Sequence, residues 1–171
     1  MADLLRQGSL SLMLTPMNLV RVVAWSLVNR WVQRTFPDVP TVPPAGLADW
    51  LSQNSGPAPI LLDGRRDDEF AVSHLPGAYS APNIETALAL DLERDRPIVV
   101  YCSVGYRSAR LAAQLQAAGY SQVYNLLGSA FQWANQGRSL VSQAQPVATV
   151  HPFNPVWGLL LKPGRAHRLD D

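Results

Sequence analysis

Residues 97–108 read PIVVYCSVGYRS and contain, in order, an apolar strand, a tight turn and the start of a helix. The strand is expected over 97–101, where β-branched side chains predominate and a proline sets the boundary. A helix is expected over 108–118, which is rich in Ala, Leu, Gln and Arg, and Gly119 follows it as a helix-ending residue. A strand, a helix and a further strand in this order form a βαβ unit with a right-handed crossover.

Two further apolar runs and two helical segments flank this unit. Strands are expected at 59–63 and 122–127, and helices at 45–53 and 85–93. Continuous apolar strands of this length are typical of a parallel sheet that is buried on both faces. The fold class is therefore α/β, with a parallel sheet flanked by helices and an added N-terminal helix.

The composition is that of a globular domain. The chain has 171 residues, of which 47% are hydrophobic and 16% are charged, and this excludes a disordered chain. The formal net charge of +1 argues against a nucleic-acid-binding protein, which carries a basic excess. The single cysteine, Cys102, has no partner for an intrachain disulfide, and three widely spaced histidines make a poor metal site. We therefore expect no metal and no cofactor.

Two proline-containing breaks divide the chain into three parts. Four prolines between residues 37 and 44 form a linker that neither a helix nor a strand is expected to cross. A second break follows residue 140, where Gln and Pro replace any periodic pattern. The expected parts are an N-terminal helix with its linker at 1–44, a compact domain at 45–141 and a C-terminal extension at 142–171.

Residues 17–36 have the periodicity of an amphipathic helix. Its expected apolar face consists of Met17, Val20, Ala24, Leu27, Val28, Trp31 and Val32. Two arginines interrupt the apolar run, so a membrane span is disfavoured, and no cleavage site supports a signal peptide. Three interpretations stay open: packing on the domain together with residues 157–161, an interfacial helix lying in a membrane surface, and dimerisation. We expect a cytoplasmic protein, and the second interpretation adds a peripheral membrane contact through 17–36.

The turn that follows the 97–101 strand carries the candidate chemistry. Cys102 lies at the carboxyl end of a parallel strand, where ligands bind in such sheets. There it faces backbone N–H groups and the positive end of a helix dipole, and both favour the thiolate. Gly105 lets successive N–H groups form an anion nest, and Arg107 adds positive charge beside it. Ser108 is placed to cap the helix or to direct its hydroxyl toward the sulfur. These neighbours favour a reactive thiol over an inert apolar filler.

The middle of the chain resembles the rhodanese domain, a sulfurtransferase fold, over roughly residues 45–141. The segments that carry the resemblance are LLDGR at 61–65 with Glu69-Phe70, SHLPGA at 73–78, CSVGYRS at 102–108 and GSAFQW at 128–133 with Gly137. The sequence departs from the family at Gly64, Ser73 and Ser129, where a small aliphatic residue and two glycines are usual. These departures affect loop geometry and remove no catalytic group.

The resemblance implies sulfur transfer through a persulfide. Cys102 would take the outer sulfur of a donor such as thiosulfate and pass it to a thiol, to cyanide or to a partner protein. Arg107 would steer an anionic donor, Tyr106 would form part of the mouth, and no partner base is needed. The loop implied to bind the substrate and the persulfide consists of Ser103, Val104, Gly105, Tyr106, Arg107 and Ser108.

Two alternatives to sulfur transfer stay open. Related folds use a Cys-and-Arg loop in phosphatases and arsenate reductases, but those phosphatases have five residues between Cys and Arg, whereas four separate Cys102 from Arg107. The second alternative is a docking or tethering domain without catalysis. The intact Cys, Gly and Arg set argues against it.

Asp63 and Arg65 are expected to support the site. Asp63 ends a strand at the same sheet edge, where it either holds the active loop through backbone N–H groups or caps the next turn. Arg65 and Glu69 stand four residues apart and form a candidate surface ion pair. His74 is interpreted as a structural turn residue, and Trp133 as a core residue or a cover for the loop.

Overall fold

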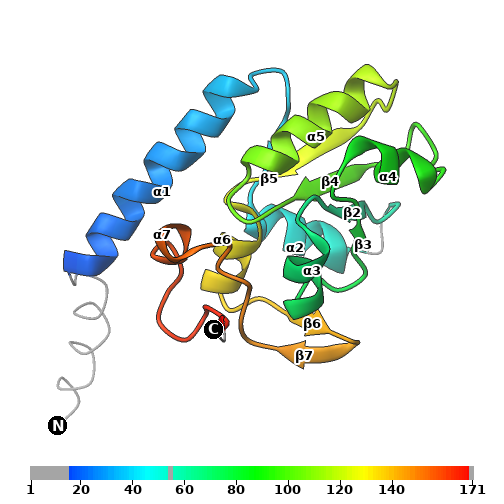
Figure 1. The fold of residues 1–171 in the computed structure, drawn as a ribbon. Helices are drawn as coiled ribbons and strands as arrows, with labels where there is room; N and C mark the ends of the chain where they lie inside the picture. Colours follow the sequence, from blue (N-terminus) through cyan, green and yellow to red (C-terminus); the bar gives the residue numbers. More distant parts are fainter. Residues whose placement is uncertain (1–15, 54–55, 170–171) are drawn as a thin grey trace, which may run out of the picture.

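A five-stranded sheet forms the centre of the computed structural model, which describes residues 16–53 and 56–169 (Figure 1). The strand order is β1–β5–β4–β2–β3 and every pairing is parallel. The strands are β1 (Thr41–Val42), β2 (Ile60–Asp63), β3 (Tyr79–Ser80), β4 (Ile98–Tyr101) and β5 (Val123–Leu126). The predicted α/β class with a parallel sheet is confirmed.

Helices cover both faces of the sheet. On one face lie α4 (Ile84–Ala89) and α5 (Tyr106–Ala117), and on the other lie α2 (Pro44–Ser52) and α6 (Ser129–Asn135). Alternate strand residues divide between the two cores, because side chains in a strand point to opposite faces. Thus Val99 packs with the α2 and α6 side, and Val100 with the α4 and α5 side.

The remaining elements lie outside this sheet. They are α1 (Pro16–Thr35), α3 (Asp67–Val72), α7 (Pro155–Gly158) and an antiparallel hairpin of β6 (Leu140–Ser142) with β7 (Gln145–Val147). The hairpin spans the predicted boundary between the domain and the C-terminal extension.

Two sequence-based expectations about elements were wrong. The helix expected at 85–93 ends at Ala89, because the chain turns at Asp91, whose φ of 49° is left-handed and cannot continue a helix. The proline linker is crossed by β1, which pairs with β5 at the edge of the sheet. An edge strand tolerates flanking prolines, and Pro44 occupies the first turn of α2, where a missing N–H costs nothing.

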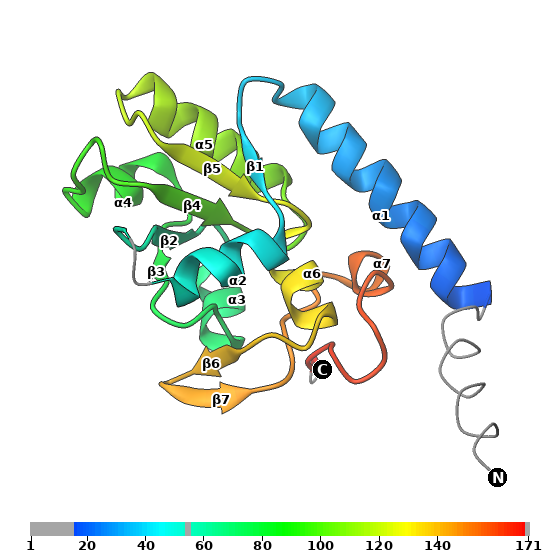
Figure 2. The ribbon, with the colours of Figure 1, turned by 180° about the vertical axis from the view of Figure 1, so that it is seen from behind.

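Helix α1 packs on the C-terminal extension, and the two segments lie side by side in both views (Figures 1 and 2). Trp25 is buried, and its Nε1 donates to the Leu160 carbonyl at 3.3 Å. The predicted apolar face is confirmed in part: Val32 is buried and Ala24 and Val28 pack against the core, whereas Met17, Val20 and Leu27 are exposed. The contact with the extension is made through Trp25, which lies in the same buried cluster as Leu160 and Leu161 and was not part of the predicted face.

Candidate functional site at the carboxyl end of the sheet

Cys102 follows β4 directly and is 1% exposed. Two groups of the following turn reach its sulfur. The backbone N–H of Gly105 donates to Sγ at 3.2 Å, and the Ser108 hydroxyl lies 3.4 Å from it. Gly105 has a φ of 112°, which a residue with a Cβ rarely adopts, and it leads directly into α5. The turn therefore brings a backbone donor, a hydroxyl and a helix N-terminus to one sulfur atom.

Ser108 lies inside α5, and Gly105 occupies the N-cap position. Of the two roles expected for Ser108, the structure thus shows the contact with sulfur and not the helix cap. The Ser108 hydroxyl also lies 2.7 Å from Asn125 Oδ1, to which it donates, and Asn125 Nδ2 donates to the Gly105 carbonyl at 3.0 Å. The side chain of Asn125, which extends from β5, therefore links the end of the turn at Gly105 to the first turn of α5 at Ser108.

Glu69 of α3 balances the charge of Arg107. The two guanidinium Nη atoms donate to the two carboxylate oxygens, both at 2.8 Å, and Ser103 Oγ donates to Oε1 at 2.9 Å. Burial acts to raise the pKa of Glu69, but its hydrogen bonds and ion pair with Arg107 outweigh burial and lower that pKa. The carboxylate stays ionised and fixes the active turn to α3.

Asp63 and Arg65 form a separate buried ion pair, with Arg65 Nη2 2.6 Å from Asp63 Oδ2. Asp63 Oδ1 also accepts from the Arg65 backbone N–H at 3.0 Å, which is the turn-capping role. Within the described part of the chain, neither side chain hydrogen-bonds to residues 102–108. The predicted pair of Arg65 with Glu69 is wrong, because each residue pairs with another one. Arg65 pairs with Asp63, two residues before it, and Glu69 pairs with Arg107.

Two other singled-out residues have structural contacts. His74 Nδ1 lies 3.0 Å from the Phe70 carbonyl, and its backbone exchanges hydrogen bonds with Val141. Trp133 is buried, and its Nε1 donates to the Ser139 carbonyl at 2.8 Å. Both therefore serve local structure.

Ser129 is a site residue whose role the sequence did not reveal. Its hydroxyl accepts from the Cys102 backbone N–H at 3.1 Å and donates to the Leu126 carbonyl at 3.1 Å. It is fully buried, and its φ of 51° is left-handed. The sequence did contain an indication of this role, since Ser129 replaces a glycine that is usual in the rhodanese domain. Asn125 likewise had a signal, as a polar residue inside an apolar strand.

A cavity of about 160 Å³ opens above the sulfur. The turn contributes one side of it, and the other side comes from the segments before and after the expected domain. The lining residues are Trp31, Cys102, Ser103, Val104, Tyr106, Arg107, Phe153 and Trp157. Both terminal segments thus take part in forming the site.

Residues 16–53 and 56–169 contain neither a membrane-spanning helix nor a cluster of metal ligands. None of their helices combines the length and the apolar character that crossing a bilayer requires. None of their His, Cys, Asp and Glu side chains gathers in a group of three or more that could hold a metal ion.

Known proteins have sequences similar to part of this chain. The probable adenylyltransferase/sulfurtransferase MoeZ of Mycobacterium tuberculosis is 38% identical over 100 residues, which are 56% of this chain and 25% of that protein. A sulfurtransferase of Allochromatium vinosum is 33% identical over 84 residues, which are 48% of this chain and 78% of that protein. The chain therefore spans about a quarter of the length of MoeZ.

Solved structures agree on the fold. The thiosulfate sulfurtransferase of Pseudomonas aeruginosa superposes with a TM-score of 0.57 at 22% identity, covering 71% of this chain and 23% of that one. A rhodanese-like domain protein of Staphylococcus aureus gives 0.53 at 23% identity, covering 62% of this chain and all of that one, 100%. At this level of identity the likeness concerns the fold alone.

The family model described as the rhodanese-like domain matches residues 47–136, more than half of the chain. That range contains the strands β2 to β5, the Cys102 turn and the supporting residues Glu69, Asn125 and Ser129. The chain therefore belongs to the rhodanese-like family.

Proposed function

We propose that the protein is a sulfurtransferase that carries sulfane sulfur as a persulfide on Cys102. The observation that carries the proposal is the convergence of the Gly105 N–H, the Ser108 hydroxyl and the N-terminus of α5 on the Cys102 sulfur. The Gly105 N–H and the positive end of α5 stabilise negative charge on a buried sulfur, and the Ser108 hydroxyl, which donates its proton to Asn125 Oδ1, contacts the sulfur without donating to it. The sulfurtransferase names of two relatives support the same reaction class.

The first half-reaction is an exchange of sulfur–sulfur bonds. The Cys102 thiolate attacks the outer sulfur of thiosulfate, a new S–S bond forms at Sγ, and the S–S bond of the donor breaks. Sulfite leaves with the electron pair, and the persulfide keeps one negative charge on its terminal sulfur. No proton has to be removed once the thiolate is present, so the turn needs no partner base.

The second half-reaction passes the terminal sulfur to an acceptor. Cyanide attacks that sulfur, the persulfide S–S bond breaks, and thiocyanate leaves while the thiolate is restored. With one cysteine in the chain, an outside thiol, cyanide or a partner protein has to accept the sulfur. A single thiol that must cycle between these forms supports a reducing compartment such as the cytoplasm.

Intact mass measurement tests the proposal. The full chain is incubated with thiosulfate, its mass is recorded, and cyanide is then added and thiocyanate assayed, with Cys102→Ser in parallel. We expect a gain of one sulfur atom that cyanide removes and that the variant lacks. Absence of both signals with thiosulfate, mercaptopyruvate and protein persulfide donors would contradict the proposal and favour a docking domain.

A further inference from the structure

The cavity above Cys102 has an aromatic wall that the family domain does not supply. Trp31 comes from α1, whereas Phe153 and Trp157 come from the C-terminal extension. All three lie outside residues 47–136, the range that the family model matches. This wall, defined here as Trp31, Phe153 and Trp157, is therefore a feature added to the common fold.

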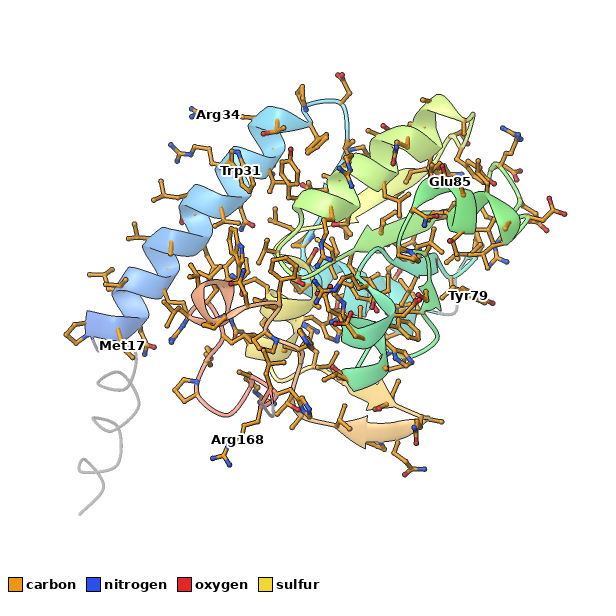
Figure 3. The ribbon with its side chains drawn as sticks, viewed as in Figure 1. Met17, Trp31, Arg34, Tyr79, Glu85 and Arg168 are labelled. Atoms are coloured by element: carbon orange, nitrogen blue, oxygen red, sulfur yellow. The ribbon has the colours of Figure 1, made fainter. Side chains whose placement is uncertain are left out.

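The wall is held in place by specific contacts. Trp31, labelled on α1 in Figure 3, stacks on Tyr106 with ring centroids 4.7 Å apart and an angle of 9° between the planes. The Phe153 ring lies 4.8 Å from the Arg107 guanidinium carbon, and its backbone N–H donates to His151 Nδ1 at 3.0 Å. The Trp157 backbone N–H donates to Asn154 Oδ1 at 2.9 Å. These contacts give the wall a defined position above the sulfur.

The charge of the cavity does not match a small dianion. Of the described residues that line it, Arg107 alone is basic. Both of its Nη atoms already donate to the buried Glu69 carboxylate. A dianion that entered the cavity would lose its hydrating water beside aromatic rings. The one cation there, Arg107, is already paired with Glu69, so this loss of hydration would not be compensated.

The size and lining of the cavity match an aromatic ring. Its volume is about 160 Å³, and a cavity of roughly 150 Å³ with apolar walls holds a benzene molecule. Burying such a ring against Phe153 and Trp157 gains both apolar contact and ring–ring contact.

We propose that the aromatic wall selects organic sulfane-sulfur donors, with an apolar or aromatic body and a single negative charge, over inorganic thiosulfate. This inference rests on the proposed sulfur transfer at Cys102. For a thiosulfonate donor, the Cys102 thiolate attacks the terminal sulfur and forms the persulfide S–S bond. The donor's S–S bond breaks, and the sulfinate leaves with the electron pair. The apolar body lies against the wall while its terminal sulfur points to Sγ.

Two donors that share the same reacting group and differ in their organic part separate the effect of the aromatic wall from the reactivity of the donor. Benzenethiosulfonate and methanethiosulfonate are both monoanions that leave as sulfinates, and only the first has a ring. We measure kcat/KM for each with cyanide as acceptor and divide it by the rate of the same donor with free cysteine in solution. The wild-type protein is expected to prefer benzenethiosulfonate at least about tenfold after this correction, which corresponds to about 1.4 kcal/mol. Thiosulfate is expected to be poorer than either.

Wall variants test which residues produce the preference. Trp157→Ala and Phe153→Ala are expected to lower the corrected preference at least about fivefold, with most of the loss on the benzene donor. Phe153→Leu keeps an apolar side chain and guards against misfolding of the alanine variant, and it should give an intermediate preference. Val156→Ala is the matched control, since Val156 is 72% exposed and does not line this cavity.

The outcomes distinguish the inference from the function on which it rests. Equal corrected rates for the two thiosulfonates, or a preference that folded wall variants retain, would overturn the inference and leave sulfur transfer intact. If no donor of either kind adds sulfur to Cys102, the proposed function itself fails.

Discussion

A single serine connects the strand end of β5 to the active cysteine. The Ser129 hydroxyl accepts a hydrogen bond from the Cys102 N–H. The Ser129 backbone is in the left-handed region, which glycine adopts with less strain than serine. A serine at this position therefore has two opposing effects on stability: its backbone is strained, and its hydroxyl forms a hydrogen bond with the buried Cys102.

Substitutions of Ser129 can separate these two contributions. Ser129→Ala keeps the strain and leaves the Cys102 N–H unpaired, so we expect a loss of about 1–3 kcal/mol in the free energy of unfolding. Ser129→Gly also loses the bond but relieves the strain, so its loss should be smaller by about 1 kcal/mol. Urea denaturation of the three proteins measures the ranking. An alanine variant as stable as the wild type would show that the hydroxyl contributes nothing.

Ion-pair partners show why part of the site could not be predicted from the sequence. Arg65 and Glu69 have the spacing of a helical pair, but Glu69 forms its ion pair with Arg107, which is 38 positions away in the sequence. Cys102, Gly105 and Ser108 were found because strand, turn and helix are contiguous in the chain. Glu69, Asn125 and Ser129 reach the turn only after the sheet has assembled, and no local pattern specifies that meeting.

At the scale of elements, length decided what the sequence could predict. The strands β2, β4 and β5 are apolar runs with clear boundaries, and each was expected within one residue of its observed ends. The edge strands β1 and β3 have two residues each and exist because a neighbouring strand offers unpaired backbone groups. Such a short strand has no periodicity to detect.

The outer face of α1 is apolar and basic. Leu19, Val23 and Leu27 follow one another at helical spacing and are 59%, 51% and 62% exposed. The helix also carries three arginines and no acidic residue between its ends, which Met17 and Arg34 mark in Figure 3. This combination is typical of a helix that lies in the surface of an anionic membrane.

We therefore expect the full chain to sediment with phosphatidylcholine vesicles that contain phosphatidylglycerol, and less with phosphatidylcholine alone. The triple variant Leu19→Ser, Val23→Ser, Leu27→Ser should lose at least about half of this binding, because each serine removes buried apolar area. Leu88→Ser, exposed on α4, is the control. Equal recovery of wild type and triple variant in the supernatant would end the membrane interpretation. A wild-type dimer that the triple variant dissolves, without vesicle binding, would favour dimerisation.

The C-terminal extension contains a buried histidine, His151, next to Phe153 of the aromatic wall. Burial lowers the pKa of His151 below its ordinary value, and its Nδ1 accepts the Phe153 N–H, which requires an unprotonated nitrogen. Because the pKa is lower in the folded state, the unfolded chain binds the proton first. The stabilisation is thus present above the ordinary value of about 6.5 and is lost as the pH falls through the folded pKa.

We expect the free energy of unfolding to fall between about pH 7.5 and pH 5 in the wild type. His151→Asn keeps an acceptor near the Nδ1 position and cannot take up a proton, so its decrease over this range should be smaller. Urea denaturation at several pH values compares the two curves. Parallel curves would show that His151 does not contribute to the acid sensitivity, which would then lie with the neighbouring Asp68 and Glu69 carboxylates.

At the scale of the whole molecule, the segments outside the family domain complete its core. Trp25 from α1 and Val150, Leu160 and Leu161 from the extension belong to the same buried cluster as Val99 at the centre of the sheet. The division into three parts that prolines indicate therefore does not describe how the core is built. The distribution of prolines showed where the sequence pattern changes along the chain. Which surfaces pack together depends on contacts between segments that are distant in the sequence.

This shared core predicts that the chain unfolds as one unit. Trp25→Ala should lower the free energy of unfolding by about 3–5 kcal/mol, because it leaves a cavity between α1 and the extension. Trp25→Phe retains most of the apolar contact and loses the Nε1 bond to the Leu160 carbonyl, so it should cost about 1 kcal/mol beyond the small change in volume. In the wild type, unfolding followed by tryptophan fluorescence and by circular dichroism should give coincident curves. Two separate transitions, with Trp25→Ala shifting only the first, would show instead that α1 and the extension form a layer that opens independently of the sheet, and the aromatic wall above Cys102 would open with it.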